Sequence, residues 1–192
     1  YKTMHNPEVD WCYKTEPDET MANRSIPYPR GKTLGGSSSI NGLLYIRGQE
    51  QDYNIWRQLG NNGWGWNDVL PYFIKSENQE RGKDEYHGDS GPLSVSDPRI
   101  KLDLLEKFMD AAEEKGIPKV MDFNRGNNFG CGYFQVTEKN GLRCSASVGY
   151  LNPIKKRKNL KIETNCHVQK INFEGTKASS VLFWKDNQSI TI

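Results

Sequence analysis

The chain has 192 residues, of which 35% are hydrophobic, and its 11% share of aromatic residues favours a globular fold over a disordered chain. The 26 basic and 24 acidic residues leave a net charge of +2, which excludes the electrostatic footprint of a nucleic-acid-binding protein. No stretch is apolar over the roughly 18 residues of a membrane span, and the four cysteines lack the spacing of a zinc site, which predicts no metal and suits a reducing compartment.

Residues 1–28 are polar and rich in turn-forming residues. Trp11 and Tyr13 alternate with other residues and predict a short extended piece. Three prolines between positions 17 and 29 keep the remainder out of helical structure. We interpret this part as a connecting segment and not as a domain.

Residues 29–48 are the most informative stretch. The glycine pair Gly35–Gly36 permits positive φ angles and lets a ligand approach the backbone. The three serines that follow offer hydroxyls and amides, which hold phosphate or a polar ring edge, and residues 40–46 are predicted to be buried behind the loop. Both a cofactor cradle and an ordinary Gly/Ser loop fit this composition. A P-loop does not, because Ile26 stands where that motif needs its first glycine.

Two short helices are predicted after this loop. The first is capped by Asp52 and ends at Gly60. The second spans residues 68–75, with Asn67 as its N-cap and Pro71 in its first turn. Before it stand Trp64 and Trp66, which either anchor the start of this helix or stack on a sugar.

Residues 76–91 are predicted to be a surface loop, and His87 within it to be a surface or turn residue rather than a catalyst. A strand follows at 93–95. Ser96-Asp97-Pro98 predicts the start of a long helix that Gly116 closes. Its apolar residues repeat at helical spacing and predict core packing. They are Leu104, Leu105, Phe108, Met109 and Ala112.

The last third of the chain is predicted to be mostly strands. A loop at 124–132 leads into a strand at 133–137, and a helical segment through Tyr150 and Leu151 ends before Pro153. Alternating residues then predict strands at 160–164, 168–173 and 181–184, with turns at 174–175 and 186–187.

The run Arg30-Gly31-Lys32-x-Leu34-Gly35-Gly36-Ser37-Ser38-x-x-Asn41-Gly42, followed by Tyr45-x-Arg47-Gly48, resembles the first signature of the glucose–methanol–choline (GMC) flavoprotein oxidoreductases. Segments 63–73, 87–93 and 143–151 match in the family's order, so the resemblance covers nearly the whole chain. It implies an α/β fold with mixed α+β character: part of a Rossmann-like FAD-binding domain and part of an antiparallel-sheet substrate domain. The expected parts are FAD-binding at 1–75, substrate domain at 76–137 and FAD-binding again at 138–192.

The resemblance also implies a cofactor, FAD, lying against residues 35–44. The residues expected to bind it are Gly35, Gly36, Ser37, Ser38, Asn41, Gly42, Leu43, Leu44 and Val168. Of these, Val168 matches the family's valine whose backbone pairs with the adenine edge. Family members that attach flavin covalently have a histidine directly before the Asn-Gly pair. Here that residue is Ile40, so we expect noncovalent FAD.

Two family features are missing. No Gly-x-Gly-x-x-Gly unit is present, and none of the three histidines matches the catalytic one, so we expect an internal fragment of the N-terminal half with no catalytic residue of its own. The predicted function is part of an FAD-dependent oxidoreductase acting on CH–OH groups, with choline or another primary alcohol as small-molecule substrate. The alternative is a noncatalytic carbohydrate-binding module. We expect a cytoplasmic or peripheral membrane protein, with no transmembrane segment in this part and no nucleic-acid partner.

Overall fold

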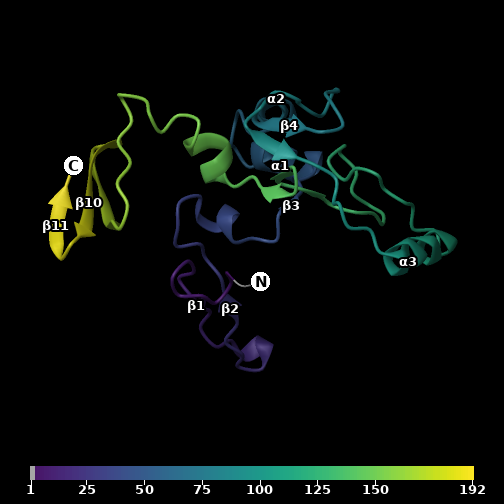
Figure 1. Ribbon diagram of the computed structural model, residues 1–192, viewed down its shortest axis with the longest axis horizontal. Coiled ribbons are helices and arrows are strands. Elements are labelled where there is room, and N and C mark those ends of the chain that lie inside the picture. The colour runs from purple at the N-terminus through teal and green to yellow at the C-terminus, as the bar shows by residue number, and fades with distance from the viewer. Residues whose placement is uncertain (1–2) are drawn as a thin grey trace. The chain divides into compact units, whose positions relative to one another are not determined.

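The computed structural model describes residues 3–192, and the chain divides into two compact units, Tyr1–Pro153 and Ile154–Ile192. Helices and strands both occur, which confirms the expected mixture of α and β structure (Figure 1). The α-helices of the described chain all belong to the first unit. The three-part division at residues 75 and 137 stays a prediction.

The first unit begins with an excursion between two short strands. Strand β1 (Tyr13–Lys14) pairs antiparallel with β2 (Pro27–Tyr28), so the expected extended piece near Tyr13 is confirmed. Between the strands lies a 3-10 turn, η1 (Glu19–Met21), which Asp18 caps by accepting a hydrogen bond from the Thr20 amide at 2.8 Å. This part is a connecting segment, as predicted, and it has no hydrophobic core of its own.

Three pairs of short strands form the centre of the first unit. They are β3 (Leu44–Tyr45) with β6 (Gln135–Val136), β4 (Glu77–Gln79) with β5 (Leu93–Val95), and β7 (Glu138–Lys139) with β8 (Leu142–Arg143). The β4–β5 pair is parallel and the other two are antiparallel. The strand expected at 93–95 is confirmed, and the one expected at 133–137 shortens to 135–136. Ser96 and Val136 exchange backbone hydrogen bonds of 2.9 Å, which joins β5 to β6.

Helices α1 (Glu50–Gln58) and α2 (Trp66–Ser76) lie side by side in the first unit (Figure 1). Aromatic rings join them, because the Tyr53 ring lies 5.8 Å from that of Trp66 and 5.7 Å from that of Phe73. Trp66 is buried, and these ring contacts add to the free energy of its burial.

Both helices were expected, but their starts differ from the prediction. Asp52 and Asp68 are each the third helical residue, and their carboxylates accept the amides of Gln49 at 2.7 Å and Gly65 at 3.0 Å. This reach back to the residue before the helix is the carboxylate half of a capping box. Asp52 is therefore not the N-cap of α1. Likewise Asn67 lies inside α2, and Pro71 falls in the second turn rather than the first.

Helix α3 (Asp103–Glu114) begins later than predicted and is not a core helix. Because Ser96 pairs with Val136 as an extended residue, the chain cannot turn into a helix there. The predicted apolar stripe is largely exposed, with Leu104 at 78% and Phe108 at 65%. The predicted helix end is confirmed, since Gly116 follows with a φ of +82° and Ile117 donates to the Ala112 carbonyl.

The first unit ends in a helical turn, η3 (Ser147–Leu151), which has π-type geometry and confirms the predicted helical segment before Pro153. Gly149 is buried within it, and a Cβ there would stand 2.7 Å from the Pro92 carbonyl oxygen. This close approach packs η3 against the loop before β5.

The second unit is a three-stranded antiparallel sheet ordered β11-β10-β9, drawn at the yellow end of Figure 1. Its strands are β9 (His167–Glu174), β10 (Lys177–Lys185) and β11 (Gln188–Thr191). Asp186 and Asn187 both take positive φ, as a tight hairpin turn requires. Strands β9 and β10 and the two turns were predicted, whereas β11 was not. The strand predicted at 160–164 was wrong, because within residues 3–192 no strand forms there. No helix in residues 3–192 is long and apolar enough to cross a membrane.

Candidate functional site

The glycine-rich loop folds as a tight turn followed by a 3-10 helix, η2 (Gly36–Ser39). Gly35 has a φ of +90° and Gly36 one of +54°, the left-handed conformations expected of this pair. The Gly36 amide donates to the Thr33 carbonyl at 2.8 Å, and the Asn41 amide donates to the Ser37 carbonyl at 2.9 Å. The loop thus has a defined shape of its own, which we call the cradle loop (residues 34–44).

The hydroxyls of Ser38 and Ser39 bond within the cradle loop, and that of Ser37 accepts the Gly31 amide at 3.2 Å. Binding of a ligand by Ser37 and Ser38 stays a prediction. Ser38 Oγ donates to the Gly35 carbonyl at 2.5 Å and accepts the Ala146 amide at 2.8 Å. Ser39 Oγ donates to the Leu34 carbonyl at 2.8 Å. A short hydroxyl beside a turn satisfies backbone groups more readily than a distant ligand does.

Among the motif's glycines, Gly36 and Gly42 leave open space, whereas Gly31 and Gly35 do not. A Cβ at Gly35 would collide with Ser39 Oγ and stand 3.2 Å from Ser147 Cβ. A Cβ at Gly31 would collide with the Gly36 carbonyl, so the approach to the loop requires glycine for packing. A Cβ at Gly36 or Gly42 would meet nothing within 4 Å among the described residues. Main chain free of side chains therefore borders an open volume at Gly36 and Gly42, the geometry that a flat ring system needs to lie against backbone.

The exit of the cradle loop is fixed by a strained residue. Leu43 has a φ of +69°, which residues other than glycine rarely adopt. Its amide donates to Asn41 Oδ1 at 3.1 Å, and its carbonyl accepts the Thr137 amide at 2.9 Å. The segment after it is less buried than predicted: Ile40 is 5% exposed, but Leu44 is 58% exposed because β3 has a neighbouring strand on one edge and no covering layer in the described chain.

Val168 lies in the second unit, whereas the other predicted cofactor-binding residues belong to the cradle loop in the first. Its strand, β9, is at the edge of the sheet, so every second backbone group of β9 points away from β10. The Val168 side chain is 57% exposed. A backbone contact of Val168 with a base edge stays a prediction.

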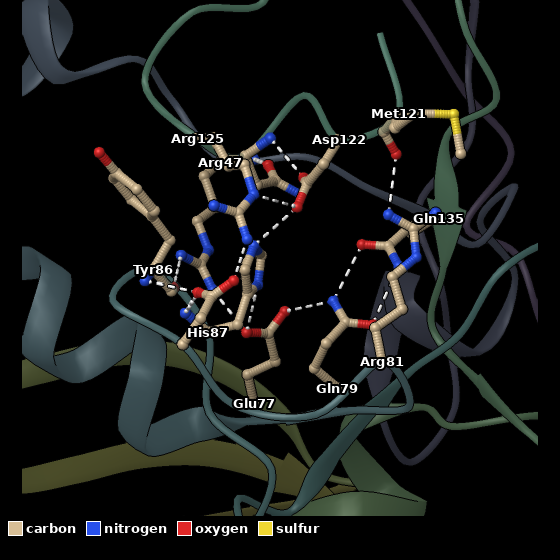
Figure 2. Close-up of polar contacts among 12 residues, drawn as sticks. Arg47, Glu77, Gln79, Arg81, Tyr86, His87, Met121, Asp122, Arg125 and Gln135 are labelled. Atoms are coloured by element: carbon tan, nitrogen blue, oxygen red, sulfur yellow. Dashed lines mark hydrogen bonds and ion pairs between the residues drawn. The ribbon is translucent and has the colours of Figure 1, made fainter.

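A buried charge cluster lies in the first unit (Figure 2). It consists of Arg47, Glu77, His87 and Asp122. Glu77 is fully buried at the start of β4, and its Oε2 lies 2.8 Å from Arg47 Nη2 and 2.9 Å from His87 Nδ1. The other ring nitrogen of His87 lies 2.9 Å from Asp122 Oδ2. Two cations and two anions are thus paired away from water, which such groups require when buried.

The cluster holds His87 in its charged form. Burial alone would lower the pKa of His87, but hydrogen bonds to Asp122 and Glu77 outweigh it and raise that pKa to about 9. Burial alone would likewise raise the pKa of Asp122, but hydrogen bonds from His87 and the Asn124 amide lower it to about 2. At neutral pH His87 is therefore an imidazolium with both nitrogens engaged, and it is no general base.

A hollow of about 350 Å³ opens beside the cluster. His87 and Asp122 line it, together with Gln79, Arg81, Gly82, Lys83, Asp84, Met121 and Arg125. Most of the charged groups around it are paired: Arg81 with Asp97, and Arg125 with Asp84 and Asp122. The Arg125–Asp84 pair and the hydrogen bond from Arg81 to the Met121 carbonyl tie the 81–87 loop to the 121–125 loop, so the arrangement is structural.

The sequence prediction missed this cluster, and placing His87 on the surface was wrong, since its side chain is 2% exposed. The reason is distance along the chain, because Arg47 precedes Glu77 by 30 residues and Asp122 follows His87 by 35. One local signal existed. The small residue Gly88 follows His87, and a Cβ there would collide with the Ile74 carbonyl, so this turn must pass tightly under α2.

The tryptophan pair does not form a sugar-binding surface. Trp66 is 6% exposed and packs between α1 and α2, whereas Trp64 is 54% exposed. Two rings cannot stack on one ligand when one of them is enclosed. The alternative expectation, that the pair anchors the start of a helix, agrees with the structure.

The four cysteines are free thiols. Among residues 3–192, no group of three or more histidine, cysteine, aspartate or glutamate side chains is arranged to hold a metal ion.

Comparison with known proteins gives one consistent result. The sequence profile of the GMC oxidoreductase family matches residues 17–192. The chain is 41% identical to an alcohol dehydrogenase [acceptor] of Pseudomonas putida over 94% of its own length and 33% of that protein. It is 40% identical to mitochondrial choline dehydrogenase of Mus musculus, over 94% and 30% of the two chains. An FAD-dependent oxidoreductase from Chaetomium thermophilum superposes with a TM-score of 0.87 at 29% identity, over 96% of this chain and 34% of that one. The chain spans about a third of the length of the proteins it matches.

Proposed function

Because the chain belongs to the GMC oxidoreductase family, we propose that it is the flavin-holding part of an enzyme that oxidises an alcohol to an aldehyde with FAD. The hydride-accepting chemistry would be that of the flavin. The residues of this chain would shape the cavity, hold the cofactor and keep water from one side of it. We expect no catalytic base from this chain, because none of its three histidines matches the family's catalytic histidine, and His87 is held protonated by its carboxylate partners.

The observation that carries this proposal is the open backbone of the cradle loop. Gly36 and Gly42 leave space where any other residue would place a Cβ. Hydrogen bonds from the Ser38 hydroxyl to the Gly35 carbonyl and from Arg143 to the Ser38 carbonyl fix the shape of the loop. A flat ring could lie against Gly42, Leu43 and Leu44 without displacing a side chain of the loop. For Val168, which lies in the second unit, the proposed contact with the adenine edge is supported by the family resemblance and by the free outer edge of β9 within its own sheet.

The proposed substrate is a small primary alcohol. Its support is the chemistry of two relatives, one named for alcohols and one for choline. The proposal therefore specifies the group that is oxidised, a primary hydroxyl, and not the rest of the substrate. Addition of choline or benzyl alcohol to the complete protein without oxygen should bleach the visible absorbance of its flavin.

The flavin is expected to be released intact when the complete protein is denatured. Ile40, which has no nucleophilic atom, stands before Asn41 and is buried, so it offers no covalent attachment. After acid precipitation the yellow colour should stay in the supernatant, and mass spectrometry should identify FAD there. Colour retained on the precipitated polypeptide would contradict noncovalent binding, and absence of any flavin from the native protein would contradict the proposed function.

The substitution Gly42→Val tests where the flavin lies. Gly42 has no left-handed φ, and a Cβ added to it would meet no atom of the described residues within 4 Å, so we expect unfolding of the flavin-free protein to be unchanged. The valine would occupy the proposed ring position and weaken FAD binding at least about tenfold, measured by fluorescence titration of the flavin-free complete protein. Ser90→Val, at an exposed loop position, is the control and should bind FAD normally. Equal affinities for both variants would place the flavin elsewhere.

A further inference from the structure

Arg143 reaches the cradle loop from 102 residues beyond Asn41. It ends strand β8, and its guanidinium makes three hydrogen bonds to the loop. Nη1 donates to the Ser38 carbonyl at 3.0 Å and to Asn41 Oδ1 at 2.7 Å, and Nη2 donates to the Asn41 carbonyl at 2.8 Å. Carbonyls at the end of a short helix have no partner within it, so the guanidinium satisfies acceptors that are otherwise left to water.

These contacts act on the residues that would face the flavin. Asn41 Oδ1, which Arg143 holds, also accepts the Leu43 amide at 3.1 Å. Leu43 is the residue with a φ of +69°, and such a conformation persists only where the surroundings determine it. Gly42 lies between the two fixed residues. Arg143 therefore determines the path of the backbone over Asn41, Gly42 and Leu43.

The support behind Arg143 is rigid. Strands β7 and β8 pair with each other, and Thr137, directly before them, donates to the Leu43 carbonyl at 2.9 Å and accepts the Cys144 amide at 2.9 Å. The base of the Arg143 side chain is thus anchored to the same loop that its guanidinium contacts. Within residues 3–192 no ion pair joins Arg143 to a carboxylate, and its guanidinium hydrogen bonds are made to Ser38 and Asn41 of the cradle loop.

We propose that Arg143 is a positioning residue for the flavin: it holds the cradle loop in the shape that presents Gly42 and Leu43 to the ring. This inference rests on the proposed function and adds a residue outside the glycine-rich motif to the cofactor site. It acts through Ser38 and Asn41. Lysine cannot replace it. The three N–H groups of an ammonium share one nitrogen, whereas the guanidinium of Arg143 contacts its three acceptors from two nitrogens held in a planar fork.

The test uses the complete protein and three variants. They are Arg143→Ala, Arg143→Lys and the control Arg81→Ala, which also removes an arginine bonded to a backbone carbonyl, that of Met121 at 2.8 Å, but away from the cradle loop. We expect both Arg143 variants to bind FAD about 10- to 100-fold more weakly, the size of effect that loss of charge-assisted hydrogen bonds produces. The visible circular dichroism of the bound flavin should also change. The control should match the wild type in both measurements.

Each outcome decides the inference. Wild-type affinity and an unchanged flavin spectrum in Arg143→Ala would overturn it. If Arg143→Ala does not fold, Arg143→Lys decides, because wild-type behaviour of the lysine variant would show that charge alone suffices and would overturn the positioning role. A wild-type protein that binds no flavin would overturn the proposed function as well, and this result differs from a flavin-bound wild type with unaffected variants.

Discussion

Replacing Glu77 by alanine is expected to lower the free energy of unfolding by about 3–5 kcal/mol, the cost of breaking a buried ion pair from one side. Four donors converge on this carboxylate. They are Arg47 Nη2 at 2.8 Å, His87 Nδ1 at 2.9 Å, the Gly88 amide at 3.2 Å and Gln79 Nε2 at 3.3 Å. Without Glu77, the guanidinium of Arg47 stays buried with no carboxylate beside it. The loss is large because the remaining charge is uncompensated, not because the pair itself is strong.

Urea unfolding of the complete protein, followed by tryptophan fluorescence, measures this effect. Asp110→Ala is the matched control, since Asp110 pairs with Lys119 at 2.7 Å on the exposed surface and should cost no more than about 1 kcal/mol. A double-mutant cycle with Arg47→Met isolates the pair, and we expect the second substitution to cost much less than the first. Similar unfolding midpoints for Glu77→Ala and Asp110→Ala would show that the cluster does not stabilise the fold.

The cradle loop and the buried charge cluster show which features of this structure can be predicted from the sequence and which cannot. The turn at Gly35 and Gly36 follows from local chemistry, because the absence of Cβ atoms determines which backbone angles are available. The pairing of Arg47 with Glu77 follows from the fold as a whole. Nothing near His87 in sequence indicates that carboxylates from two other segments enclose it.

The same distinction separates the secondary-structure predictions that were confirmed from those that were wrong. The hairpin turn at Asp186–Asn187 and the end of α3 at Gly116 depend on one or two residues, and both were predicted. The start of α3 was not, because the Ser96–Val136 backbone pairing across the chain overrides a good local helix-start signal. Periodicity also predicted an apolar face on α3 but could not say what covers it, and Leu104 is exposed in the described chain.

Stability is expected to fall by about 3 kcal/mol as the pH rises from about 6.5 to about 9, because His87 binds its proton more tightly in the folded state. The pKa of His87 rises from its ordinary 6.5 to about 9 because hydrogen bonds to Asp122 and Glu77 outweigh the opposing effect of burial. A raised folded-state pKa gives stabilisation that is complete below the unfolded value and is lost as the pH passes the folded one. The groups that face the ring are Glu77 and Asp122, with Arg47 and Arg125 bound to those carboxylates.

The variant His87→Gln separates this effect from other titrations, because glutamine retains hydrogen-bonding capacity without a proton to lose. The wild type should show an unfolding midpoint that declines between pH 6.5 and 9, and His87→Gln should be less stable at pH 6 and flatter over this range. Asp122 gives the opposite dependence at the acid end: its pKa of about 2 means that its contribution is complete above about pH 4 and is lost as the pH falls toward 2. Parallel curves for wild type and His87→Gln between pH 6.5 and 9 would mean that folding does not raise the pKa of His87, and Arg47 would then be the cation of the cluster that balances the charge of Glu77.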